Sequence, residues 1–228
     1  MKKIGLSNNQ LKILAMIAMT LDHVGYSLFP EVEWLRIVGR LALPIFAYMI
    51  AEGCHHTRHP LRYLGTMLGF SALCQGVYFF AMGSLYMCIL VTFSLSIAGI
   101  LLIRLAETKQ NIFLWLLPVA ALAGIYYICQ VLPAKLPDTD FEIDYGFWGV
   151  MLPVLIYAGR DRWGKLMCLF GGLCLLAYDC EAIQWWSLLA IPLLALYNGQ
   201  RGRWKMKWFF YLFYPLHLVI IYGISQLM

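Results

Sequence analysis

Long apolar runs follow one another along the 228-residue chain, and charged residues interrupt them only briefly. Hydrophobic residues make up 62% of the sequence and charged residues 13%, whereas a soluble domain typically carries about 25% charged residues. A chain with so little polar surface cannot cover a globule in water, which excludes a soluble enzyme and a disordered protein. Because about 20 apolar residues span a bilayer as a helix, the sequence predicts an all-α polytopic membrane bundle.

Dividing the chain at its charges and at its Gly/Pro clusters predicts nine transmembrane helices in one domain that covers residues 1–228. The sixth to eighth runs are short and contain Pro153 and Pro192, so one of them could be re-entrant or tilted. The expected spans are 11–29, 36–53, 61–82, 85–105, 112–132, 146–159, 165–180, 183–197 and 207–227.

The basic residues alternate along these spans in a way that predicts the topology. With a cytoplasmic N-terminus, fourteen of the 17 lysines and arginines lie on the cytoplasmic side, and most acids lie outside. The positive-inside rule produces this pattern, so we expect the N-terminus inside and the C-terminus outside. The net charge of +5 then reflects topology, and no nucleic-acid partner is expected. The fourteen residues are Lys2, Lys3, Lys12, Arg58, Arg62, Arg104, Lys109, Arg160, Arg162, Lys165, Arg201, Arg203, Lys205 and Lys207.

The longest outer connection, residues 133–145, reads PAKLPDTDFEIDY and holds four acids against one lysine. It is either a solvated loop or an anionic entrance that attracts a cationic acceptor. The seven cysteines lie mostly inside apolar runs and lack a C-x-x-C spacing, so we expect small core residues. Neither a disulfide framework nor a metal site is expected, because no His/Asp/Glu trio has a ligand spacing.

Ionisable side chains at membrane depth are costly and mark functional candidates. Four groups qualify: Asp22 with His23, Arg36 with Arg40, Glu52, and His217 with Tyr214. At a rise of about 1.5 Å per residue, His23 lies roughly 18 Å and His217 roughly 15 Å from the inner face. Arg40 lies roughly 9 Å from the outer face, so three spans direct polar groups toward one layer.

The spacing within these groups separates their roles. Arg36 and Arg40 share a helix face, and Asp22 can neutralise one of them, which is also a purely structural explanation for all three. Asp22 and His23 point about 100° apart, so His23 is either a general base or a neutral histidine that is hydrogen-bonded across helices. For His217 the competing role is core packing.

The inner loop EGCHHTRHPLRYL, residues 52–64, is the richest polar cluster of the chain. Arginines among histidines suit phosphate recognition, with Arg58 and Arg62 as the candidates. The alternative is a plain positive-inside anchor.

Four stretches resemble the TraX family of membrane acetyltransferases, named for a protein that N-acetylates conjugative pilin. They are LKILAMIAMTLDHVGYSLFP at 11–30, LRIVGRLALPIFAYMIAEGCHHTRHPLRYL at 35–64, DYGFWGVMLPVLIY at 144–157 and FFYLFYPLHLVIIY at 209–222. The family is similar to a wider class of transmembrane acyltransferases in which a basic residue precedes a first-helix histidine with ten residues between. Lys12 and His23 have that spacing here.

The resemblance implies a multi-pass protein of the bacterial cytoplasmic membrane that takes acetyl-CoA as its donor. The acceptor would be an amine, such as a pilin N-terminus, or a hydroxyl of a protein or glycan at the outer face. His23 would be the base, Asp22, Arg36, Arg40 and His217 would shape the site, and Lys12, Arg58 and Arg62 would hold the CoA phosphates. Direct attack and a route through acetyl-His23 both stay open, as does a homodimer. A transporter or flippase and a non-catalytic assembly factor for a surface appendage are the alternatives.

Overall fold

The computed structural model describes residues 5–202 and 206–227, and in this part of the chain nine helical segments follow one another, one of them interrupted by a turn at Arg40–Leu41. They coincide with the nine predicted runs, so the all-α prediction is confirmed. In order they are α1 (Asn8–Ser27), α2 (Glu33–Gly39) with α3 (Ala42–His56), α4 (Pro60–Met82), α5 (Ile89–Lys109), η1 (Ile112–Trp115) with α6 (Leu116–Tyr126), η2 (Tyr127–Val131) and α7 (Leu132–Lys135), α8 (Gly146–Ala158), α9 (Arg162–Asp179), η3 (Ala182–Leu189) with α10 (Ala190–Ala195), and α11 (Lys207–Ser225).

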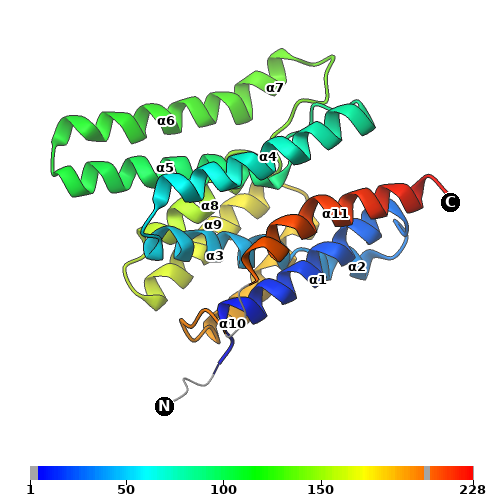
Figure 1. Ribbon diagram of the computed structural model, residues 1–228, viewed down its shortest axis with the longest axis horizontal. Coiled ribbons are helices and arrows are strands. Elements are labelled where there is room, and N and C mark those ends of the chain that lie inside the picture. Colours follow the sequence, from blue (N-terminus) through cyan, green and yellow to red (C-terminus); the bar gives the residue numbers. More distant parts are fainter. Residues whose placement is uncertain (1–4, 203–205, 228) are drawn as a thin grey trace. The chain divides into compact units, whose positions relative to one another are not determined.

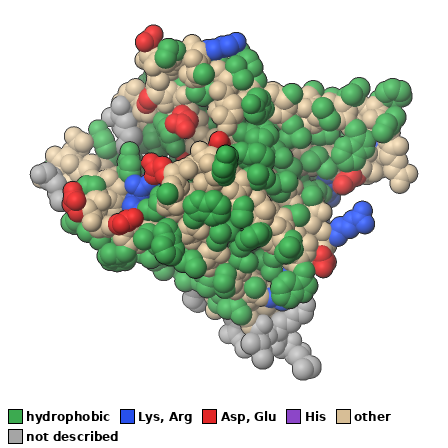
Figure 2. Space-filling model, turned by 180° about the vertical axis from the view of Figure 1, so that it is seen from behind, with side chains coloured by type: hydrophobic (Ala, Val, Ile, Leu, Met, Phe, Trp, Pro, Cys, Tyr) green, Lys and Arg blue, Asp and Glu red, His purple; other side chains and the backbone are tan. Residues whose placement is uncertain are grey.

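Four of these segments are long and apolar enough to cross a membrane: Glu33–His56, Ile89–Lys109, Ile112–Lys135 and Trp208–Ser225. Hydrophobic side chains cover most of the face shown in Figure 2, and charged side chains gather in small groups. This surface suits lipid, and the molecule is a helical membrane protein. Full spanning by the other segments and the N-inside topology stay predictions. Of the basic residues that support the topology, Lys2, Lys3, Arg203 and Lys205 lie outside the described residues.

Prolines explain where the helices depart from regular α geometry. A proline has no N–H to donate to the carbonyl four residues before it. Pro44 therefore leaves the carbonyl of Arg40 without its helical donor, and the predicted helix 36–53 turns between α2 and α3. Pro133 follows the π-helical stretch η2, and Pro192 follows the 3₁₀ stretch η3 in the same way.

The described residues group into two compact units, one within Met1–Met49 and Asp161–Met228 and the other within Ile50–Arg160. The single domain that the sequence predicts stays a prediction. In the first unit α1 packs against α2 and runs beside α11 (Figure 1), while η3 packs against α2 and α9. Gly25 lets α1 and α2 approach closely, because a Cβ there would lie 2.7 Å from the Cβ of Leu35. Such close helix contacts through small residues are typical of membrane proteins.

In the second unit α5 packs against α4, α6 and α8 (Figure 1). Four cysteines are buried as small core residues: Cys54, Cys74, Cys88 and Cys129. The acidic connection is tied down by a short parallel bridge, in which Met87 N donates to Glu142 O at 2.8 Å and Asp144 N donates to Met87 O at 3.0 Å.

Candidate functional site

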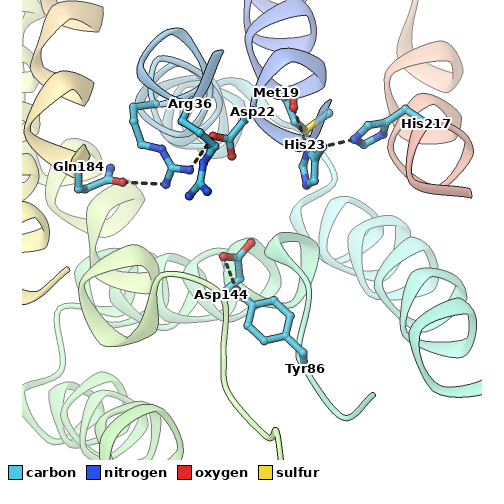
Figure 3. A network of polar contacts seen from close by, with 9 residues as sticks. Met19, Asp22, His23, Arg36, Tyr86, Asp144, Gln184 and His217 are labelled. Atoms are coloured by element: carbon cyan, nitrogen blue, oxygen red, sulfur yellow. Dashed lines mark hydrogen bonds and ion pairs between the residues drawn. The ribbon is translucent and has the colours of Figure 1, made fainter. Parts of the chain in front are cut away.

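The carboxylate of Asp22 on α1 joins two arginines in the first unit. Its Oδ1 accepts hydrogen bonds from Arg40 Nη2 at 2.6 Å and from Arg36 Nε at 3.2 Å (Figure 3). The Asp22 side chain is 17% exposed and that of Arg40 is 9% exposed. The sequence predicted a pair with one of these arginines, and the structure shows that the carboxylate serves both.

Arg40 extends this network to η3. Its Nη1 donates to Oε1 of Gln184 at 3.3 Å, and Gln184 is 1% exposed. Gln184 is not among the predicted site residues, although an uncharged amide inside the apolar run 183–197 is a visible signal. It went unnoticed because only ionisable groups were considered at membrane depth.

His23 and His217 form a second polar contact in the same unit. The Nε2 of His217 lies 3.4 Å from Nδ1 of His23. As Figure 3 shows, Asp22 points toward the arginines and His23 points toward His217. The predicted divergence of Asp22 and His23 is therefore present, but the partner of His23 was not foreseen.

The hydrogen bonds of the two rings assign their tautomers. His23 Nδ1 lies 2.8 Å from the carbonyl of Met19, and His217 Nδ1 lies 3.0 Å from the carbonyl of Phe213. A carbonyl only accepts, so both Nδ1 atoms carry the proton in the neutral rings. His217 Nε2 is then an acceptor for the His23 Nδ1–H. His23 Nε2 keeps its lone pair, and within the described residues it makes no hydrogen bond.

Aromatic contacts hold the His217 ring in this orientation. The Phe213 ring stacks on it with an interplanar angle of 8° and a centroid distance of 5.1 Å. Tyr214 meets it edge-on at 5.4 Å between centroids. The packing role that the sequence suggested for His217 is therefore present together with its contact to His23.

The three predicted CoA-binding residues lie in different units. Lys12 belongs to the first unit, where its Nζ lies 5.3 Å from the centroid of the Phe210 ring. Arg58 and Arg62 belong to the second unit, where Arg58 lies just before α4 and Arg62 lies in its first turn. Both arginines are exposed, and their guanidinium groups make no hydrogen bond or ion pair within the part of the chain that the structure describes. Their guanidinium groups are thus available to an anion.

Two of the three histidines of the inner loop contact neighbouring groups of the second unit. His55 stacks on Tyr157 with 4.2 Å between ring centroids, and its Nε2 lies 3.2 Å from the Tyr157 carbonyl. His56 Nδ1 lies 2.9 Å from the carbonyl of Glu52. Glu52, a candidate by depth, is buried at the end of α3.

Two of the four acids in the outer connection hold the loop in place. Asp140 accepts hydrogen bonds from Ser84 Oγ at 2.5 Å and from Leu85 N at 2.8 Å, and Asp144 accepts one from Tyr86 Oη at 2.8 Å. The hydrogen bond from Ser84, together with that from Leu85, holds the pKa of Asp140 below its usual range. Asp140 stays ionised and exposed, so an anionic entrance would draw on Asp138, Asp140 and Glu142.

Comparison with known proteins gives one match over nearly the whole chain and one over a short stretch. A probable fimbrial assembly protein, FimC of serogroup H1 from Dichelobacter nodosus, is 27% identical, with 96% of each chain covered. An uncharacterized protein of Rickettsia prowazekii, RP591, is 55% identical over 38 residues, which are 17% of this chain and 15% of the relative. No solved structure matches the chain.

The family comparison decides the assignment that the sequence motifs suggested. The model of the TraX protein family matches residues 7–225. This range contains the four stretches on which the resemblance rested, together with Asp22, His23 and His217. The chain therefore belongs to the TraX protein family.

Proposed function

We propose that this protein is an acetyltransferase of the bacterial inner membrane. It would move an acetyl group from cytoplasmic acetyl-CoA to an amine, such as the N-terminus of a pilin-type subunit, at the outer side of the membrane. The observation that supports this most directly is the orientation of His23, whose Nε2 lone pair is unengaged while its Nδ1–H is held by Met19 and His217.

That orientation suits a general base. A base needs an accessible lone pair on a group that is neutral near pH 7, and an imidazole meets both requirements. His23 Nε2 would take a proton from the attacking amine as its nitrogen bonds to the thioester carbonyl carbon. The C–S bond then breaks, CoA leaves as a thiolate, and the imidazolium returns the proton to that sulfur. The products are the acetylated amine and CoA.

The pair of arginines would supply the positive charge that this reaction needs. The tetrahedral intermediate carries an oxyanion, and fixed donors near it lower the barrier. Asp22 holds both guanidinium groups in place, so they are organised before the charge develops. Asp22 is thus a positioning residue in this proposal.

Donor binding would use Arg58, Arg62 and Lys12. Arginine binds phosphate oxygens bidentately, whereas lysine acts as a point charge. The exposed, unengaged guanidinium groups of Arg58 and Arg62 fit the CoA phosphates, and the predicted topology places them on the cytoplasmic side.

The acceptor class follows from the fimbrial assembly protein that resembles this chain. Fimbriae are built from protein subunits, so a polypeptide amine is the first acceptor to test, and a glycan hydroxyl is the second. Because the acceptor is outside, it would be presented from the outer half of the membrane.

The test is acetyl transfer by purified protein in detergent, followed by mass spectrometry. The protein is incubated with acetyl-CoA and a peptide with a free N-terminus, and a gain of one acetyl group on that amine is the expected result. The same reaction with the His23→Ala variant should be slower by about 10² to 10⁴. Stabilisation by CoA in a thermal-shift measurement would show donor binding independently, since a ligand that binds the native state raises its stability. Indifference to CoA and absence of transfer would overturn the proposal.

A further inference from the structure

Two buried polar groups on η3 have no partner in the described part of the molecule. They are the amide nitrogen of Gln184 and the hydroxyl of Ser187. Gln184 is 1% exposed and Ser187 is fully buried. Buried polar groups in native proteins are nearly always hydrogen-bonded, so two such groups three residues apart need an explanation.

Arg40 determines which end of the Gln184 amide is unengaged. A guanidinium group can only donate hydrogen bonds, so the amide oxygen must face Arg40 Nη1, as it does at 3.3 Å. The NH₂ group is thereby directed away from Arg40. Its two N–H bonds are donors that require an oxygen or another acceptor.

The 3₁₀ geometry of η3 places both groups on one face. Side chains at positions i and i+3 eclipse one another in a 3₁₀ helix because each turn takes three residues. Gln184 and Ser187 have this spacing within Ala182–Leu189. An amide donor and a hydroxyl therefore project from one face of η3, and the amide lies next to the guanidinium of Arg40.

We propose that Gln184 and Ser187 form a subsite for a carbonyl oxygen of the acceptor, the first peptide carbonyl beside the N-terminal amine. Two neutral donors match an uncharged carbonyl oxygen, which accepts through both of its lone pairs. The inference rests on the proposed acetyltransferase function and deepens it by naming the residues that would recognise a polypeptide acceptor. A polypeptide amine carries this carbonyl, and a simple alkylamine does not.

The matched variant is Gln184→Glu. Its carboxylate keeps the shape of the side chain and still accepts from Arg40, but it has no N–H to donate. Acetyl transfer is measured with a peptide amide and with an alkylamine of similar length. We expect the ratio of the peptide KM to the alkylamine KM to rise about tenfold. The new carboxylate faces Arg40, so any fall in kcat should be the same for both acceptors. Ser187→Ala should raise the peptide KM by a smaller factor.

The control is Ser96→Ala. Ser96 is as buried as Ser187, but its hydroxyl already donates to Val150 O at 2.7 Å. This variant should affect both acceptors equally. If Gln184→Glu and Ser187→Ala also change both acceptors equally, or change neither, the carbonyl subsite is wrong although the acetyltransferase proposal stands.

A binding measurement separates this inference from the reaction itself. Thermal shift in detergent is recorded with the peptide amide and with the alkylamine, without acetyl-CoA. Greater stabilisation by the peptide, lost in Gln184→Glu, supports the subsite even if no acetyl transfer is found. Equal stabilisation by both compounds overturns it.

Discussion

His217 Nε2 lies 3.4 Å from His23 Nδ1, although 194 residues separate the two histidines in sequence. The rings meet edge-on, with an interplanar angle of 75° and centroids 5.0 Å apart. The contact joins α1 and α11, which also pack against each other. Because His217 presents an acceptor to the Nδ1–H of His23, it favours the tautomer in which His23 Nε2 is the base.

The first prediction concerns His23 itself. His23→Ala should reduce kcat by about 10² to 10⁴, because a positioned general base contributes that much. CoA binding should be unchanged, since no CoA-binding role falls to this ring. The measurement is steady-state acetyl transfer with purified protein, with CoA-dependent thermal shift as the test of folding. Near-parental transfer by folded His23→Ala would contradict the assignment.

His217 should behave as a positioning residue. His217→Gln retains a side-chain oxygen that can accept from the His23 Nδ1–H, whereas His217→Ala does not. We expect His217→Ala to lower kcat and His217→Gln to recover part of that loss. Equal activity of the two variants would show that His217 only packs between Phe213 and Tyr214.

Asp22 should matter for folding more than for substrate binding. Asp22→Asn removes the charge that two guanidinium groups share, and breaking a buried ion pair costs about 3–5 kcal/mol. The free energy of unfolding in mixed detergent should therefore drop by at least about 2 kcal/mol, since the site is partly exposed. Asp138→Asn, at an exposed position, is the control and should change little. A loss no larger than that of the control would mean that the arginines are neutralised elsewhere.

Much of the helical arrangement could be predicted because apolar runs of this length have few other solutions. The turn at Arg40–Leu41 was missed because Pro44 acts on a carbonyl four residues earlier, inside a run that is uniformly apolar. The π-helical stretch before Pro133 has the same origin. Hydropathy depends on the polarity of side chains alone, so it does not detect a missing backbone N–H donor.

The candidate site was predicted in part. Asp22, Arg36 and Arg40 could be predicted from their depth and charge, because an unpaired charge at membrane depth is costly and opposite charges there are expected to pair. The contact between His23 and His217 depends on how α1 and α11 are rotated, and one sequence does not encode that rotation visibly. Gln184 was missed because the candidates were ionisable side chains at membrane depth, and its amide is uncharged.

The donor-binding prediction tests the inner loop. Arg58→Ala with Arg62→Ala should raise KM for acetyl-CoA, and each charge-assisted phosphate contact that is lost should contribute about 1.5–3 kcal/mol, or roughly ten- to a hundredfold. The value of kcat should change little. Arg162→Ala is the matched control, because Arg162 is exposed at the start of α9 and is expected on the same side of the membrane. If the control and the double variant change KM for acetyl-CoA equally, Arg58 and Arg62 only help to set the membrane topology.

The loop around Asp140 should open at low pH. The pKa of Asp140 lies below its usual range because Ser84 and Leu85 donate to its carboxylate. A carboxylate whose folded pKa is lowered stabilises the fold above its unfolded pKa and loses this contribution as the pH falls through the folded pKa. Hydrogen exchange of the Leu85 amide should therefore accelerate below about pH 4 relative to the intrinsic rate. In Asp140→Asn this pH dependence should vanish, whereas Asp138→Asn should keep it.

The variant Gly39→Ala tests the contact between α1 and α2 most directly. A Cβ at Gly39 would collide with the side chain of Asp22, so the methyl group must displace the carboxylate that joins Arg36 and Arg40. We expect a loss of about 2–4 kcal/mol in unfolding free energy and a fall in acetyl transfer. Gly69→Ala is the control, because a Cβ at Gly69 in α4 meets nothing within 4 Å, and alanine favours a helix by up to about 1 kcal/mol.

A double-mutant cycle shows whether Gly39 acts through Asp22. If the added methyl group destabilises the fold by displacing the carboxylate, the combination of Gly39→Ala and Asp22→Asn should cost clearly less than the sum of the two single changes. Chemical denaturation of the four proteins in the same detergent gives the coupling energy. Additive losses would mean that Gly39 only sets the distance between the α1 and α2 backbones, and that the Asp22 ion pairs survive the change.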